Sequence, residues 1–404
     1  MMLTPHTASR LLLPLLGLAA FAVMGTEVAA VGIQRPVAAE FDVSTGMAGL
    51  LVTVYAAGVA IGGPLLAFAL AGRPRRPTMA GLLVAFAATQ GLAAVAPDLG
   101  LLLGARALAG IVGGAIFALL TVTAVGVAEP GREGRALATV ALGLTLATVA
   151  GTPLSNAVGE QAGWRPVFWG IAAIALLVAV GLWASVPAGR PTEGSASWPR
   201  TLLRSGPARS GVLDTVLSTP ATFYAYTYLT SLLADPTGLG ETGTVVILAI
   251  LGVAAAIGTT VGGRLLDRDA GRHLPALALG SATALAVLAA GAAVPVIVAV
   301  ACAAFGFLAF ALVPILQGRV IAAAGDTPLV AAAVNISAFN VANAVGAAIG
   351  GLAVGASGIR APIAAAAALS LLAAIALRSR GARSNATACT RATGAGAGAD
   401  LPAN

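Results

Sequence analysis

Apolar runs long enough to cross a membrane recur along the chain, and short segments rich in Arg, Pro and Gly separate them. A helix of about 20 residues spans the hydrocarbon core of a bilayer. Because the first run is longer than a usual signal core and many similar runs follow it, we expect a membrane span there and not a signal peptide. We predict an all-α integral membrane protein with twelve transmembrane helices, at 11–33, 46–70, 77–96, 99–122, 134–157, 166–187, 212–234, 242–266, 273–292, 294–317, 328–355 and 361–378.

The distribution of arginine predicts which loops face the cytoplasm. With an even number of spans and both ends inside, 18 of the 22 Arg lie in cytoplasmic segments, three in external loops, and one, Arg106, within the fourth span. Cytoplasmic loops of membrane proteins carry an excess of basic residues. We therefore predict a multi-pass protein of the inner (plasma) membrane with both termini in the cytoplasm.

The composition agrees with a membrane protein and excludes several other classes. The chain is 58% hydrophobic and 9% charged, whereas soluble domains carry about 25% charged residues. Its Arg residues are scattered over short loops, so the net charge of +7 does not indicate a nucleic-acid partner. Cys302 and Cys389 lie far apart, and His6 and His273 have no partner at ligand spacing. We expect no disulfide, metal site or cofactor.

A polar connection divides the predicted spans six and six. We assign an N-terminal six-helix bundle to 1–187, a cytoplasmic linker to 188–211 and a C-terminal six-helix bundle to 212–380. The tail at 381–404 is rich in Ala, Gly and Thr, lacks an apolar period and is expected to be disordered.

The two halves repeat each other in sequence. Gly58–Leu66 and Gly258–Leu266 share five of nine residues, and each segment ends the second span of its half. Gly163–Arg165 and Gly358–Arg360 form a second pair, each after the fifth span of its half. Parallel repeats of this kind place a binding site near the midplane, between the halves.

Twelve spans, a six-plus-six repeat and a Gly-rich segment leading into an Arg-rich loop resemble the major facilitator superfamily. The details are most similar to its bacterial drug:proton antiporter branch, near the sugar-efflux and chloramphenicol-resistance-like permeases. The resemblance covers about residues 11–378. It implies secondary transport by alternating access.

The loop after the second span of each half is similar to the family motif G-x-x-x-D-x-x-G-R-R/K. The second-half copy keeps the acid as Asp267, followed by Arg268. The first-half copy begins at Gly63 but has Ala67 where the Asp belongs. The resemblance implies that Asp267 latches the two halves on the cytoplasmic side. The alternative is a solvated loop charge paired with Arg268 or Arg272.

Two charged residues lie inside predicted spans, Glu27 in the first and Arg106 in the fourth. A charge in a membrane span costs several kcal/mol, so such residues are functional candidates. The resemblance implies that Glu27 couples transport to protons and that Arg106, in an R-x-x-x-G pattern, assists. The alternatives are a buried Glu27 hydrogen-bonded within its half and a structural Arg106 that donates to backbone carbonyls.

The fifth span contains Gly143, Gly151 and Pro153, which resemble the Gly-rich G-P motif of the antiporter branch. Small residues allow close approach of helices, and Pro introduces a kink. Ordinary helix packing, with no bearing on transport direction, is the alternative.

Polar and aromatic residues within other spans are candidates for contact with cargo. Cavity lining competes with an aromatic belt for the tyrosines and with interhelical hydrogen bonds for the asparagines. Asp214, at the start of the seventh span, is interpreted as an interfacial charge. The candidate cavity residues are Tyr55, Tyr224, Tyr228, Asn335, Asn340 and Asn343.

We therefore predict secondary active export of a small organic molecule, a drug, antibiotic or metabolite, in exchange for protons. Efflux of an arabinose-like sugar or another metabolite is the alternative, and an integral-membrane enzyme is a remote one. The chain has no Lys to complete a nucleotide-binding P-loop, so ATP is not expected to drive transport. The expected partners are the small-molecule substrate, protons and the lipid bilayer, and we expect a monomer.

Overall fold

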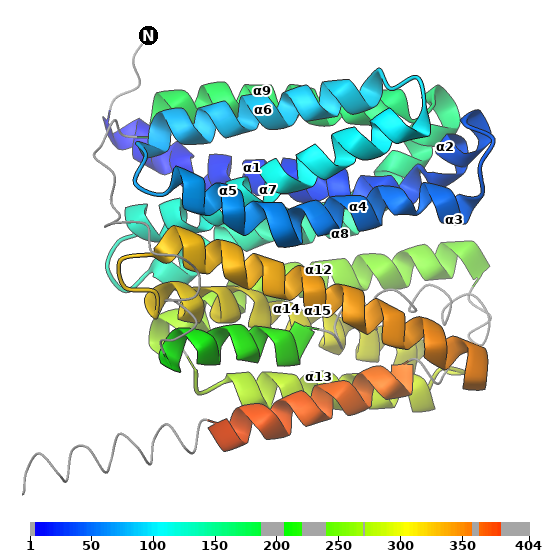
Figure 1. The fold of residues 1–404 in the computed structure, drawn as a ribbon. Helices are drawn as coiled ribbons and strands as arrows, with labels where there is room; N and C mark the ends of the chain where they lie inside the picture. The colour runs from blue at the N-terminus through cyan, green and yellow to red at the C-terminus, as the bar shows by residue number, and fades with distance from the viewer. Residues whose placement is uncertain (1–4, 187–205, 220–239, 270, 358–362, 381–404) are drawn as a thin grey trace, which may run out of the picture.

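The structure is a computed structural model that describes residues 5–186, 206–219, 240–269, 271–357 and 363–380. The described residues form helices joined by short turns, with no strand among them. Figure 1 shows the helices lying side by side, those of the first half on one side of the molecule and those of the second half on the other. The predicted all-α integral membrane fold is confirmed.

Helices of the first half follow the predicted spans to within a few residues. The predicted second span is a continuous rod in which a π-helical turn, η1, interrupts the α-helix. The elements are α1 Pro5–Gly32, α2 Gln34–Glu40, α3 Thr45–Ala48, α4 Leu50–Ala57, η1 Gly58–Gly62, α5 Gly63–Leu70, α6 Arg75–Ala94, α7 Leu99–Val127, α8 Glu133–Ala162 and α9 Arg165–Ser185.

The second half continues the pattern. Its labelled helices are α12 Gly240–Arg268, α13 Leu274–Ala290, α14 Pro295–Ala322 and α15 Pro328–Ser357, with further helices at 206–219 and Ile363–Arg380. Within the described residues, ten helices are long and apolar enough to cross a membrane, and α13 is a shorter apolar helix. The predicted seventh span is described only as far as residue 219. The count of twelve is consistent with this arrangement.

Local sequence signals explain where several helices begin. Asp98 precedes α7, and its carboxylate accepts a hydrogen bond of 2.9 Å from the backbone N–H of Leu101, which caps the helix. Pro295 occupies the first turn of α14, where its missing N–H costs no helical hydrogen bond. Gly163 has φ +78° and turns the chain between α8 and α9.

We call one end of the molecule the Arg-rich end. There α5, α7 and α12 end and α6, α8 and α13 begin, at the left of Figure 1. Arginines of these loops and helix ends include Arg73, Arg75, Arg76, Arg132, Arg135, Arg268 and Arg272. That this end faces the cytoplasm stays a prediction.

The halves meet along several helices. α8 of the first half packs against α12 and α14, and α15 of the second half packs against η1, α5 and α7. Near the Arg-rich end, Gly134 and Gly263 face each other, and a Cβ added to either would collide with the other's carbonyl oxygen. The absence of side chains at these two positions therefore allows the halves to touch. The domain boundaries at 187/188 and 211/212 stay a prediction.

Candidate functional site

A cavity of about 70 Å³ lies between the two halves. Its walls come from α1, α4, η1, α7 and α8 on one side and from helix 206–219, α14 and α15 on the other. Most of the wall is apolar and includes Met24, Phe117 and Phe339. The polar side chains that line it are Glu27, Tyr55, Thr121, Thr215, Gln317, Asn335 and Asn340.

Glu27 lies near the C-terminal end of α1, five residues before Gly32, and contributes the only acidic side chain among the described residues that line this cavity. It is half-buried. The described residues provide no hydrogen-bond or ion-pair partner for its carboxylate, whereas Arg106 donates to other groups. The alternative for Glu27 was a hydrogen bond within its own half. The described residues show no such bond.

Arg106 is fully buried in α7, and backbone carbonyls hold its guanidinium. Its Nε donates to the carbonyl oxygen of Leu51 at 3.1 Å, and its Nη1 donates to the carbonyl oxygen of Thr26 at 3.0 Å and to the hydroxyl of Thr26 at 2.8 Å. This is the structural arrangement considered as the alternative for Arg106. Because Thr26 precedes Glu27, Arg106 also fixes the segment of α1 that carries the carboxylate. A direct part in proton transfer stays a prediction.

Tyr55 contacts both Arg106 and the cavity. The Arg106 Cζ lies 4.5 Å from the centre of the Tyr55 ring, and the Tyr55 hydroxyl donates to the carbonyl oxygen of Val23 at 3.1 Å. An arginine over an aromatic face is stabilised by the ring quadrupole. Tyr55 lines the cavity, and its contact with cargo stays a prediction.

Thr26 and Gln90 belong to the same buried network and were not assigned to it from sequence. The Thr26 hydroxyl donates to Gln90 Oε1 at 2.7 Å while it accepts from Arg106. Polar residues at these two positions of otherwise apolar spans indicate a buried hydrogen bond. Nothing in the sequence predicts that the two residues, from α1 and α6, contact each other.

The asparagines of α15 divide into different environments. Asn335 and Asn340 line the cavity, and the Asn340 amide also donates to the carbonyl oxygen of Ile336 at 2.9 Å. That either residue contacts cargo stays a prediction. Asn343, three residues further along, is not one of the described residues that line this cavity. Tyr224 and Tyr228 lie outside the described residues. The sequence missed Thr215 and Gln317, which complete the second-half wall.

Asp267 joins the two halves at the Arg-rich end. Its Oδ1 accepts a hydrogen bond of 2.6 Å from the backbone N–H of Gly134, and its Oδ2 lies 3.3 Å from Arg135 Nε. The Asp267 side chain is 4% exposed, so it is not the solvated loop charge considered as the alternative. Its ion-pair partner comes from the other half and is neither Arg268, which is exposed, nor Arg272.

The glycines singled out from the motifs lie at close helix crossings. A Cβ on Gly143 would collide with the carbonyl oxygen of Gly17 in α1, and one on Gly151 would collide with the Val28 side chain. Gly63 packs against Gly114 of α7, with 3.3 Å between an added Cβ and the Gly114 Cα. Pro153 lies inside α8, two residues after Gly151. These residues bring α1 against α8 and α5 against α7.

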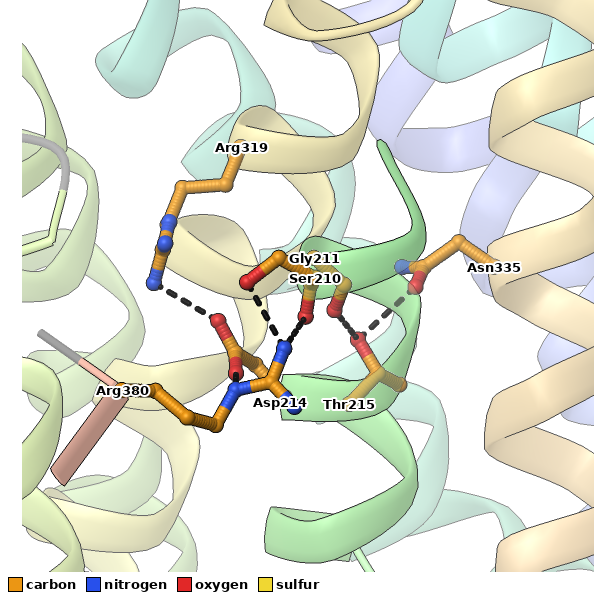
Figure 2. Close-up of polar contacts among 7 residues, drawn as sticks. All are labelled: Ser210, Gly211, Asp214, Thr215, Arg319, Asn335 and Arg380. Carbon is orange, nitrogen blue, oxygen red and sulfur yellow. Dashed lines mark hydrogen bonds and ion pairs between the residues drawn. The ribbon is translucent and has the colours of Figure 1, made fainter. Parts of the chain in front are cut away.

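Asp214 corrects an interpretation made from sequence. It is 2% exposed and is not an interfacial charge. Figure 2 shows it between Arg319 and Arg380. Its Oδ2 lies 2.9 Å from Arg319 Nη1, and its Oδ1 lies 3.0 Å from Arg380 Nε. Arg380 also donates to the carbonyl and hydroxyl oxygens of Ser210. Two cations stabilise a buried carboxylate that would otherwise be costly, and the cluster ties helix 206–219 to α14 and to the last described helix.

Comparison with known proteins identifies the family. A profile of the Major Facilitator Superfamily matches residues 15–336. The inner membrane transport protein YdhP of Escherichia coli (strain K12) is 36% identical over 351 residues, covering 84% of this chain and 88% of that protein. The chloramphenicol resistance protein of Streptomyces lividans is 34% identical over 345 residues, covering 83% and 87%.

Solved structures share the fold. The transporter FucP in its outward conformation superposes with a TM-score of 0.73 at 16% identity, covering 92% of this chain and 98% of that one. The human organic anion transporter MFSD10 gives 0.73 at 15% identity, with 91% and 99% covered. Both the relatives and the profile span most of the chain, so this protein belongs to the Major Facilitator Superfamily and is a multi-pass membrane transporter, not an enzyme.

Proposed function

We propose that this protein exports a small, neutral organic molecule of the chloramphenicol class from the cell in exchange for protons. Relatives named as a chloramphenicol resistance protein and as a chloramphenicol efflux pump support the choice of substrate class. The predominantly apolar cavity wall with a few polar groups suits such a molecule.

One observation carries the proposal. Glu27 lines the cavity between the halves, and the described residues leave its carboxylate without a hydrogen bond or ion pair. A carboxylate in such a place can take up a proton when the cavity opens to one side and release it when the cavity opens to the other. Ionisable residues inside membrane bundles mark ion and proton pathways.

The remaining site residues have supporting roles in this proposal. Arg106, through Thr26, and Tyr55 hold α1 and the cavity wall in place. Asp267 latches the halves at the Arg-rich end, which we take to be cytoplasmic, while Gly63, Gly143, Gly151 and Pro153 allow the helices to pack closely.

Purified protein in proteoliposomes tests the proposal. An imposed pH gradient should drive accumulation of labelled chloramphenicol, and an ionophore that exchanges protons for potassium should abolish it. Labelled arabinose, the cargo of the alternative, should not accumulate. Transport of arabinose without transport of chloramphenicol would replace the substrate class, and accumulation that survives the ionophore would overturn the coupling to protons.

A further inference from the structure

We infer that Gln317 forms a subsite for a neutral hydrogen-bonding group of the ligand, such as an amide or a hydroxyl. This inference deepens the proposed function and rests on it, because it takes the cavity as the place where cargo binds. Gln317 lies in α14, lines the cavity and is 8% exposed.

A chain of hydrogen bonds connects the Gln317 side chain to Asn335 and Thr215. The Thr215 hydroxyl donates to Asn335 Oδ1 at 2.7 Å, and Asn335 Nδ2 donates to Gln317 Oε1 at 2.6 Å. Figure 2 shows the first of these contacts, between helix 206–219 and α15. All three residues line the cavity. The chain therefore builds one polar strip on an otherwise apolar wall, with side chains from three helices.

The strip ends in an unused donor. Gln317 Nε2 is buried and has no hydrogen-bond partner among the described residues. Buried polar groups are almost always paired, because an unpaired one loses its interactions with water and gains none in return. A ligand oxygen in the cavity would supply the missing partner. This pairing would favour ligands with a polar group at that position over apolar ones of the same shape.

The strip can also present an acceptor. The Thr215 hydroxyl lies 3.3 Å from the Gly211 carbonyl oxygen as well as 2.7 Å from Asn335 Oδ1, and its single hydrogen can serve one of them. If Thr215 donates to Gly211, both amides can turn over, and the Gln317 oxygen then faces the ligand. The subsite thus suits groups that donate or accept, and amides and hydroxyls do both.

The strip itself carries no charge. The acid next to it in sequence, Asp214, is held by Arg319 and Arg380, while Thr215 points to Asn335 (Figure 2). Glu27 belongs to the opposite half of the protein. Because a buried, unpaired ion is costly, a neutral group is the better partner for Gln317. A ligand with one neutral polar end and an apolar body fits this wall.

Binding of two fragments of similar shape tests the inference without knowledge of the natural cargo. Benzamide carries a neutral amide on an aromatic ring, and toluene carries a methyl group. We would measure equilibrium binding of both to the detergent-purified full chain, for wild type and for Gln317→Leu. Wild type should prefer benzamide, and Gln317→Leu should weaken benzamide binding about fivefold to tenfold with toluene binding unchanged.

Two further variants separate the subsite from general damage. Gln317→Met keeps the length of the side chain and should reproduce the selective loss of benzamide. Ser218 does not line this cavity, and its buried hydroxyl also lacks a hydrogen-bond partner among the described residues. Ser218→Ala should therefore leave the binding of both fragments unchanged. Equal affinity of wild type for the two fragments, or full benzamide binding by both Gln317 variants, would overturn the inference. Selective benzamide binding without gradient-driven transport would instead overturn the proposed function and leave the subsite standing.

Discussion

Asp267 of α12 and Gly134 of α8 are joined by a hydrogen bond of 2.6 Å, from the Gly134 backbone N–H to the carboxylate. Gly134 is in the first turn of α8, where backbone N–H groups lack helical partners and the helix dipole favours a negative charge. Arg135, in the same turn, adds an ion pair at 3.3 Å. The contact therefore links the two halves through charge as well as hydrogen bonding.

Asp267→Asn should loosen the halves at the Arg-rich end. The amide oxygen of Asn can still accept a hydrogen bond from Gly134, but it carries no charge to interact with the helix dipole and with Arg135. The loss costs the closed state about 1 kcal/mol, which shifts the ratio of closed to open molecules roughly fivefold. Spin labels at exposed Arg132 and Arg272 should report a larger population of long distances by double electron–electron resonance. Asp269→Asn removes a nearby exposed acid and serves as the control; equal distance distributions in both variants would contradict a latch.

Gly143→Ala should destabilise the first half. The added methyl would overlap the Gly17 carbonyl and push α8 from α1, and overpacking of this kind costs about 1–3 kcal/mol. The thermal unfolding temperature in detergent measures the effect. Gly170→Ala is the matched control, because an added Cβ there meets nothing within 4 Å. If both substitutions leave the unfolding temperature unchanged, the crossing is not as tight as the structure has it.

Arg106→Ala should impair transport more than Arg76→Ala. The first change leaves the carbonyls of Leu51 and Thr26 without their donor and opens a space beside Tyr55. Arg76 lies near the Arg-rich end, with its guanidinium 4.6 Å from the Trp183 ring, and is not fully buried. Initial rates of transport, normalised to folded protein, compare the two. Equal and mild effects would mean that the Arg106 network is dispensable.

Glu40 predicts a pH-dependent contribution to stability at the end opposite the Arg-rich end. Hydrogen bonds from Arg165 lower the pKa of Glu40 below its ordinary value, and Trp164 Nε1 also donates to it at 2.7 Å. The stabilisation is present above the pKa of Glu40 in the unfolded chain and is lost as the pH falls through the lower pKa of the folded state. Glu40→Gln should therefore lower the unfolding temperature near neutral pH and have less effect in acid. A difference that grows on acidification would contradict this assignment.

The helices could be predicted from the sequence because membrane spans are recognisable by their length and apolar composition. The family could be predicted from the repeat and the loop motif. The resemblance of its loop motif singled out Asp267, which contacts Gly134 and Arg135 of the other half, and its role as a latch stays a prediction. Contacts across the bundle were harder to predict. The partners of Arg106 are backbone carbonyls of α1 and α4, and a sequence carries no signal for which carbonyls a buried guanidinium meets.

Asp214 and Gln317 illustrate the same limit. Asp214 lies near the end of a predicted span, where a charged residue is usually expected to be solvated. Only the packing of α14 and of the last described helix brings Arg319 and Arg380 to it. Gln317 lies near the Arg-rich end of α14, two residues before Arg319, in an otherwise apolar helix. Its place in the cavity wall depends on the meeting of three helices, which periodicity alone does not predict.

Glu27→Gln in proteoliposomes tests the central claim most directly. The account predicts that this variant still exchanges labelled for unlabelled chloramphenicol at equal pH but no longer accumulates it under an imposed pH gradient. Glu160→Gln, which neutralises an exposed acid of α8 that accepts from Asn156, should retain both activities. Accumulation by Glu27→Gln at the rate and extent of wild type would contradict the claim that this carboxylate carries the proton.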